Sequence, residues 1–356
     1  MNINYKDLTT EQRSVAIQRL TALWAFSESG LGGIMHALQI PFTGLAVGGL
    51  AIIMICFIAH VSDQKYGQIL RSLLIVLVIK AMVSPYTPFP AYIAVSFQAL
   101  MGFVLFSLFR VNLVSILLLS IITMLESALQ QLLILTLFFG QSIWKATDAF
   151  VAFIAKQFNL HAVNGSQWII GIYLAIYLVG AICVTWITRK TIAGFESGNA
   201  MVTGLNSTGL NRESFIVTHS NKKNSTRKLW ILIGLLVLLS VVLFFVAADT
   251  KQGWIAVLKM VCWTLSSILI WFMIINPLFT KFIKQFLHKK EGRYSEEVSR
   301  VLSFLPVLRQ LTAGAWTNSR SYKGWTRWSY FLSTLVHWSL TYENQPLTGS
   351  SFKKTA

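Results

Sequence analysis

Six uninterrupted apolar segments, each long enough to cross a lipid bilayer as a helix, constrain the fold more than any other feature. A membrane-spanning helix needs roughly 20 mostly apolar residues. Two weaker segments, 68–84 with Lys80 and 20–38 with several glycines, bring the expected number of spans to eight. Only 12% of the residues are charged and 54% are hydrophobic, whereas a soluble domain carries about 25% charged residues. The sequence predicts an all-α polytopic membrane protein, whose clear spans are 40–61, 89–109, 112–138, 168–188, 229–247 and 254–276.

The distribution of charge predicts the orientation of these spans. The net charge is +17, and much of it lies in the loop 189–228 and in the tail after 277. The positive-inside rule assigns such segments to the cytoplasm. Eight spans then leave both termini cytoplasmic, in a multi-pass protein of the cell membrane, which we expect to be a bacterial inner membrane. Because the tail interleaves basic residues with tryptophans, we expect it to contact membrane lipids and not nucleic acid.

The polar segments divide the chain into five expected parts. A further feature lies between the fifth and sixth spans, where 139–167 has apolar residues at helical spacing and predicts an interfacial amphipathic helix. The five parts are a cytoplasmic N-terminal amphipathic helix at 1–19, a six-span bundle at 20–190, a cytoplasmic polar linker at 191–228, a two-span hairpin at 229–276 and a basic aromatic cytoplasmic tail at 277–356.

The stretch "AFSESGLGGIMHA" in the first span has a small residue at every fourth position. These residues are Ala25, Ser29, Gly33 and Ala37. Small residues four apart share one helical face and let another helix approach closely within lipid. The stripe therefore predicts either a docking face for a separate membrane subunit or tight packing against a neighbouring span of the same chain.

Ionisable and amide side chains inside the apolar segments are the candidates for function. Intramembrane charges are costly, so each is a functional hypothesis by default. Glu28 and His36 lie in the same stretch but on a different helical face from the small stripe, and a Lys80–Glu126 pair is a plausible way to lower the cost of both charges. Such a pair would either border a polar cavity or be a purely structural ion pair.

The sequence contains no motif of a known catalytic or nucleotide-binding site. It has neither a P-loop nor a glycine-rich dinucleotide-binding loop, and its histidines and three cysteines lack metal-ligand spacing. We therefore expect no metal, no cofactor and no enzymatic activity. Any ATP-driven step would require another subunit.

Residues 10–190 resemble the substrate-binding S components of energy-coupling factor (ECF) vitamin transporters. The resemblance rests on six expected spans with short hairpins, on the small stripe of the first span and on the proline-rich turn "SPYTPFPAYIAVSFQALMG" at 84–102. It implies that Ala25, Ser29, Gly33 and Ala37 dock a transmembrane coupling subunit, with a separate ATPase supplying energy. The two extra spans and the basic tail depart from the family.

The resulting expectation is a membrane uptake protein that captures a small vitamin-like or metabolite ligand from the outer face. The pocket would lie between the outer halves of spans three to six. The alternative is a non-catalytic membrane scaffold or assembly protein, in which the buried charges pair and no cavity forms. A lipid enzyme would need polar residues that converge at one depth. The expected ligand contacts are Lys80, Tyr92, Gln98, Glu126, Gln130, Trp144 and Asp148.

Overall fold

The computed structural model describes residues 9–37, 42–84, 87, 89–157, 164–196 and 251–341, and these form helices without strands. Five of the helices are long and apolar enough to cross a membrane, so the chain is an all-α polytopic membrane protein. The helices are α1 (Thr10–Phe26), α2 (Gly32–Ala37), α3 (Thr43–Val61), α4 (Gly67–Val83), α5 (Phe89–Phe109), α6 (Leu113–Phe139), α7 (Ser142–Gln157), α8 (Gly165–Glu196), α10 (Lys251–Ile270), α11 (Asn276–Asn318) and α12 (Gly324–Thr341), with short turns η2 (Ser27–Leu31), η3 (Trp271–Ile275) and η4 (Ser319–Ser321).

Helix α3 lies at the centre of the bundle and packs against α1, α5, α6 and α8. Its sequence is apolar on every side, and such a helix is stable only when it is surrounded. All the residues from Ala51 to Ala59 are at most 2% exposed. Gly102 of α5 lets α3 come close, because a Cβ there would stand only 2.6 Å from Cγ2 of Ile55. Helix α3 is therefore the apolar core around which the neighbouring helices pack.

The first helical stretch is continuous from Thr10 to Ala37 through α1, the π-helical turn η2 and α2. Thr9 starts it with a capping box, in which its hydroxyl accepts from the Gln12 backbone and Gln12 accepts from the Thr9 backbone. The structure thus has no break at residue 19, where a cytoplasmic helix was expected to give way to a span. Residues 1–8 lie outside the described part.

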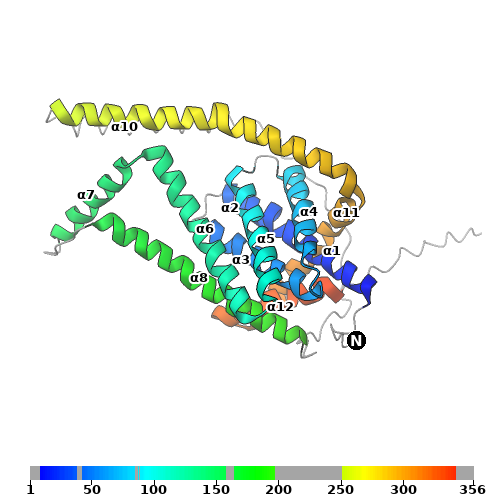
Figure 1. The fold of residues 1–356 in the computed structure, drawn as a ribbon. Coiled ribbons are helices and arrows are strands. Elements are labelled where there is room, and N and C mark those ends of the chain that lie inside the picture. Colours follow the sequence, from blue (N-terminus) through cyan, green and yellow to red (C-terminus); the bar gives the residue numbers. More distant parts are fainter. Residues whose placement is uncertain are drawn as a thin grey trace, which may run out of the picture.

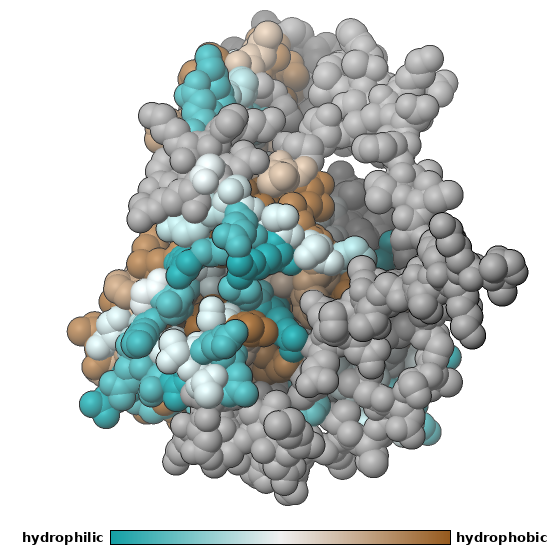
Figure 2. Space-filling model, turned by 90° about the vertical axis from the view of Figure 1, so that its right-hand side faces the viewer, coloured by the Kyte–Doolittle hydropathy of each residue, from teal (hydrophilic) through white to brown (hydrophobic). Residues whose placement is uncertain are grey.

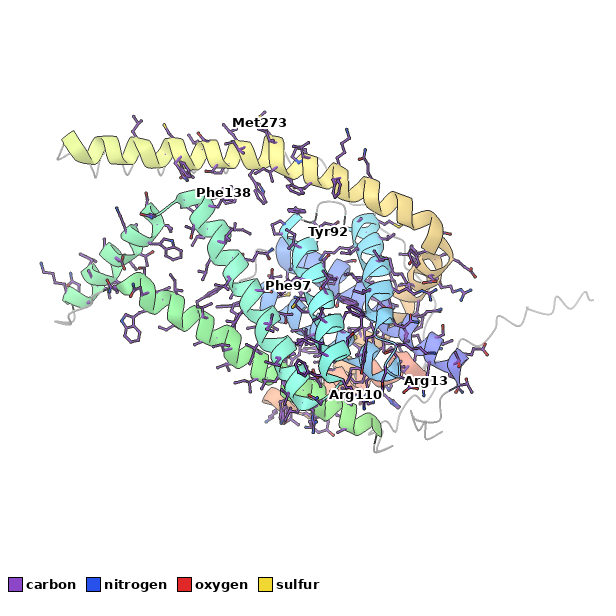
Figure 3. The ribbon with its side chains drawn as sticks, viewed as in Figure 1. Arg13, Tyr92, Phe97, Arg110, Phe138 and Met273 are labelled. Carbon is purple, nitrogen blue, oxygen red and sulfur yellow. The ribbon has the colours of Figure 1, made fainter. Side chains whose placement is uncertain are left out.

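We define two ends of the bundle by their residues. At the Lys80 end, α4 and α6 end and α5 begins; at the Lys65 end, a turn joins α3 to α4. Figure 3 shows Tyr92 and Phe138 at the first of these ends and Arg110 and Arg13 toward the second.

The helix formed by α10, η3 and α11 runs across the Lys80 end (Figure 1). Two aromatic contacts attach it there. Phe279 stacks on Phe89 with ring centroids 4.1 Å apart, and the rings of Trp271 and Phe138 pack edge to face. The expected span 254–276 is thus helical, but it crosses the bundle helices instead of running beside them. The other half of the expected hairpin, 229–247, and the linker from 197 onward lie outside the described residues.

The expected tail packs against the bundle. Helix α11 turns down one side and contacts α1 and α4, and α12 contacts α1 and α8. At the other side of the bundle, α7 and the first half of α8 extend away from α4 and α5 (Figure 1). Helix α7 is amphipathic, as its sequence predicts, and the apolar residues of α8 are widely exposed, as suits contact with lipid.

Candidate functional site

A buried ion pair joins the first helical stretch to α4. Oε2 of Glu28 lies 2.6 Å from Nζ of Lys80, and neither side chain is more than 4% exposed. The two residues are 52 positions apart and both belong to apolar segments. The sequence identified both charges as candidates, but it suggested Glu126 as the partner of Lys80. The structure places Glu28 there because η2 packs against α4.

The carboxylate of Glu28 is carried by a π-helical turn. The Gly32 amide donates to the Ser27 carbonyl five residues earlier, so η2 holds one residue more than an α-helical turn. Such turns appear mostly as single insertions within α-helices and occur frequently at functional sites. The hydroxyl of the neighbouring Ser29 is buried and has no hydrogen-bond partner among the described residues. Glu28 and Ser29 are thus one charged and one unsatisfied polar residue at consecutive positions of the turn.

Helix α5 contributes an aromatic ring to this site. The Lys80 ammonium lies 5.8 Å from the centre of the Tyr92 ring, within the range of a cation–π contact. Nearby along α5, the Pro90 carbonyl accepts a hydrogen bond of 3.0 Å from the side-chain amide of Gln130 on α6. Glu28, Ser29, Lys80 and Tyr92 are called the Lys80 site below. Gln130 ties together the two helices at its edge.

A second polar group lies around Gln98 in the bundle interior. Gln98 is 3% exposed, and its Oε1 lacks a hydrogen-bond partner among the described residues. Its side-chain nitrogen would stand 3.1 Å from a Cβ at Gly48 of α3. The Ser127 hydroxyl lies near the same Cβ position at Gly48. One turn earlier on α3, a Cβ at Gly44 would meet both Ser127 and the Tyr177 hydroxyl. The Gln98 group thus joins four helices through small and polar residues.

The tyrosines of this second group were not among the residues predicted from the sequence. Tyr173 and Tyr177 are four residues apart in α8, and their hydroxyls lie 3.3 Å from each other. Phe42 stacks on the Tyr173 ring, with centroids 6.0 Å apart. A four-residue spacing of hydroxyl-bearing rings within a span was the signal that could have identified them.

The remaining expected ligand contacts lie in different environments. Glu126 of α6 has a buried Oε2 without a partner among the described residues and does not pair with Lys80. The Trp144 indole donates to Thr136 at the end of α6, and Asp148 accepts from the Ser166 backbone near the start of α8. These two residues therefore fasten α7 to its neighbours, on the part of the fold that extends away from α4 (Figure 1).

The small stripe faces the interior of the chain along its first two positions. Ala25 is fully buried and Ser29 is 7% exposed. A Cβ at Gly33 would stand 3.5 Å from the Ser84 hydroxyl oxygen at the end of α4. This is the internal packing that the sequence left open as an alternative to docking. His36 and Ala37 belong to α2, but their side chains lie outside the described part.

The described residues bring no three His, Cys, Asp or Glu side chains together as a metal site would. Comparison of the chain with protein-family models, with curated proteins and with solved structures finds no match. The Lys80 site and the Gln98 group are therefore the candidates for function among the described residues.

Proposed function

We propose that the protein is a membrane uptake protein whose Lys80 site binds a small metabolite that carries a carboxylate. The observation that carries this proposal is the Glu28–Lys80 ion pair, buried within the bundle and held at a π turn. In this function the chain binds its ligand without catalysing a reaction and requires no cofactor. The orientation predicted from the charges would place the Lys80 end on the outer face of the membrane.

Stability alone is a weak reason for two buried charges. Removing two ions from water costs several kcal/mol each, and apolar replacements of a buried pair are often neutral or stabilising. Charged residues inside membrane segments instead mark substrate pathways and binding sites as a rule. Glu28 and Lys80 are both nearly inaccessible, so the cost of desolvation falls on both. A binding role accounts for this cost, because the pair can exchange one partner for a ligand.

The chemistry of the site favours a carboxylate-bearing ligand. Such a ligand can replace the Glu28 carboxylate at the Lys80 ammonium without leaving a net buried charge behind, provided that it also offers a cation to Glu28. The Ser29 hydroxyl is available as an additional donor or acceptor, since it has no partner among the described residues. The Tyr92 ring supplies an apolar wall beside the cation. An amino-acid-like or vitamin-like metabolite fits these groups.

The transport step itself would draw on other subunits. The resemblance to ECF S components implies a transmembrane coupling subunit and a separate ATPase as partners. Ala25 and Ser29, the first positions of the expected docking stripe, are covered by the chain itself. A coupling subunit would thus have to contact a different surface of the bundle.

A thermal-unfolding screen of the full chain in mild detergent tests the proposal. Amino acids, carboxylate vitamins and their amides or esters would be added singly. A ligand at 100 times its Kd stabilises the folded state by about 2.7 kcal/mol, which raises the Tm by roughly 2 °C or more in a protein of this size. We expect carboxylates to raise the Tm and their esters to have no effect.

Variants of the ion pair supply the control for this screen. Glu28→Leu combined with Lys80→Met should abolish the ligand-dependent shift, whereas Arg300→Gln on the exposed face of α11 should leave it unchanged. A carboxylate that raises the Tm of the double variant as much as that of the wild type would refute binding at the Lys80 site. Absence of any shift across the library would refute the uptake function in this form.

The alternative, a non-catalytic membrane scaffold, is favoured by one specific observation. Glu28 and Lys80 already neutralise each other, and the stripe beside them is packed internally. In a scaffold, the pair would only fix the relative position of the first helix and α4. The same screen separates the two functions, because a scaffold gives no carboxylate-dependent shift.

A further inference from the structure

The Lys65 end of the bundle contains a polar pocket that the uptake proposal does not use. Its volume is about 400 Å³, and it is bounded by α1, by the turn between α3 and α4, by α4 and by α11. The hydroxyls of Thr21 and Ser72 lie 2.7 Å apart at its buried base. Figure 2 shows that hydrophilic residues gather on the side of the molecule where α1 begins and α11 turns.

The charges around this pocket favour a single negative charge in the ligand. Three cations line it: Arg13, Lys65 and Arg71. Arg13 pairs with Asp63 at 2.6 Å, and Arg71 forms a two-pronged pair with Glu297. Among the described residues, Lys65 has no carboxylate within ion-pair distance, so the lining retains one uncompensated positive charge. A phosphate diester carries one negative charge and matches this lining.

A second pocket directly beside the first is lined in part by apolar groups. It has a volume of about 470 Å³ and shares Arg71 and Glu297 with the polar pocket. Its other lining residues are Gly67, Leu70 and Leu74 along one face of α4, and Tyr294 of α11. A polar pocket and a neighbouring partly apolar one, joined at an arginine, fit a molecule with a charged head and a hydrocarbon chain.

The position in the membrane agrees with such a ligand. Helix α4 coincides with the expected span 68–84, and in that span the turn before it would lie at headgroup level. The positive-inside rule predicts that Lys65 and Arg71 are on the cytoplasmic side, where anionic lipids attract basic residues. We propose that the two pockets bind one anionic phospholipid, with its phosphate in the polar pocket near Lys65 and the start of an acyl chain along Leu70 and Leu74.

Native mass spectrometry of the full chain, stripped of lipid in detergent, tests this proposal. Phosphatidylglycerol, phosphatidylcholine and glycerol 3-phosphate would be titrated separately. We expect phosphatidylglycerol to bind more tightly than phosphatidylcholine and glycerol 3-phosphate to bind weakly. Lys65→Gln should weaken phosphatidylglycerol binding about five-fold, the effect expected of one lysine near an anionic surface. Lys145→Gln, an exposed lysine on α7, is the matched control and should bind as the wild type does.

A glycine variant tests the acyl-chain part separately. A Cβ at Gly67 meets nothing within 4 Å, so Gly67→Leu can fill the second pocket without displacing the backbone. It should weaken phosphatidylglycerol binding and leave glycerol 3-phosphate binding unchanged. Gly171→Leu on α8, which also has open space, is its control. Thermal unfolding without lipid would show that each variant is folded.

Two results would overturn the lipid assignment. Equal binding of phosphatidylglycerol to the wild type and to Lys65→Gln would show that the lipid phosphate does not bind in this pocket. Tight binding of glycerol 3-phosphate that depends on Lys65, without any effect of Gly67→Leu on phosphatidylglycerol, would make the pocket a site for a soluble phosphate ester instead.

Discussion

Arg19 of the first helix donates a hydrogen bond to the backbone carbonyl of Leu340 in the last helix, 321 residues later. The same guanidinium lies 5.8 Å from the centre of the Phe304 ring in α11. One side chain thus contacts the two tail helices at once, and the tail belongs to the folded bundle. The expected cytoplasmic tail is thus in contact with the bundle helices.

Replacing Arg19 should loosen the tail. We expect Arg19→Ala to lower the free energy of unfolding by about 1.5–3 kcal/mol, the usual worth of a hydrogen bond to a charged group. The variant should also be cut faster by trypsin within 276–341. Limited proteolysis followed by mass spectrometry measures this, with Glu296→Gln on the exposed face of α11 as the control, because it removes no trypsin site. Equal cleavage rates would show that the contact does not hold the tail.

Replacing one residue of the Glu28–Lys80 pair should lower the free energy of unfolding more than replacing both. We expect Glu28→Leu or Lys80→Met alone to destabilise the protein by about 3–5 kcal/mol, because each leaves one buried charge without its partner. The double variant should be considerably more stable than either single variant. Chemical unfolding in detergent, analysed as a double-mutant cycle, gives the coupling energy.

The exposed pair of Glu296 and Arg300 on α11 is the matched control for that cycle. These residues are four apart on one helix, and both side chains are more than half exposed. Their coupling should be below about 0.5 kcal/mol. A Glu28–Lys80 coupling as small as this would mean that the buried pair is not formed in the membrane protein.

The small stripe can be tested by adding volume to it. Ala25 is fully buried, so Ala25→Leu should destabilise the protein by about 1–3 kcal/mol through overpacking. Ala175→Leu on the exposed face of α8 should change stability little. Thermal unfolding of the purified chain measures both. An Ala25→Leu variant that is fully stable but no longer retains a membrane partner would instead support the docking role that the sequence suggested.

Acidification should weaken the contact of α12 with the bundle. Burial lowers the pKa of His337 below its ordinary value of 6.5. The unfolded chain therefore takes up a proton more readily than the folded one, and stability should fall as the pH drops below about 6.5. His337→Gln should flatten the dependence of the Tm on pH between about 5 and 7.5. An unchanged slope in the variant would assign the dependence to other groups.

The apolar segments were sufficient to predict most of the helices. The expected span 89–109 matches α5 (Phe89–Phe109), and 112–138 differs from α6 (Leu113–Phe139) by a single residue at each end. These boundaries follow from hydropathy together with local signals such as the Asn112 cap. The sequence also predicted α4 as the segment 68–84. This segment is short and contains Lys80, but the rest of it is a largely apolar run.

The pairing of side chains between helices could not be predicted in the same way. Hydropathy places Lys80, Glu28 and Glu126 inside the membrane segments but contains no information on which helices are neighbours. The partner of Lys80 was settled by the packing of η2 against α4. The aromatic attachment of Phe279 to Phe89, which turns α10 and α11 across the bundle, has no periodic signal in the sequence either.

The π turn at Ser27–Leu31 also changes how the stretch "AFSESGLGGIMHA" must be read. Each residue of an α-helix advances the direction of its side chain by about 100°. The turn absorbs one additional residue, so every side chain after Leu31 is rotated back by about that angle relative to a regular helix. Residues spaced by four before and after it no longer form a straight line, and Gly33 leaves the row that Ala25 and Ser29 begin. Deletion of Gly30, within the turn and after Glu28, would leave a regular α-helix whose flanking residues keep their present directions, so Glu28 would still face Lys80 and Gly33 would stay outside the row.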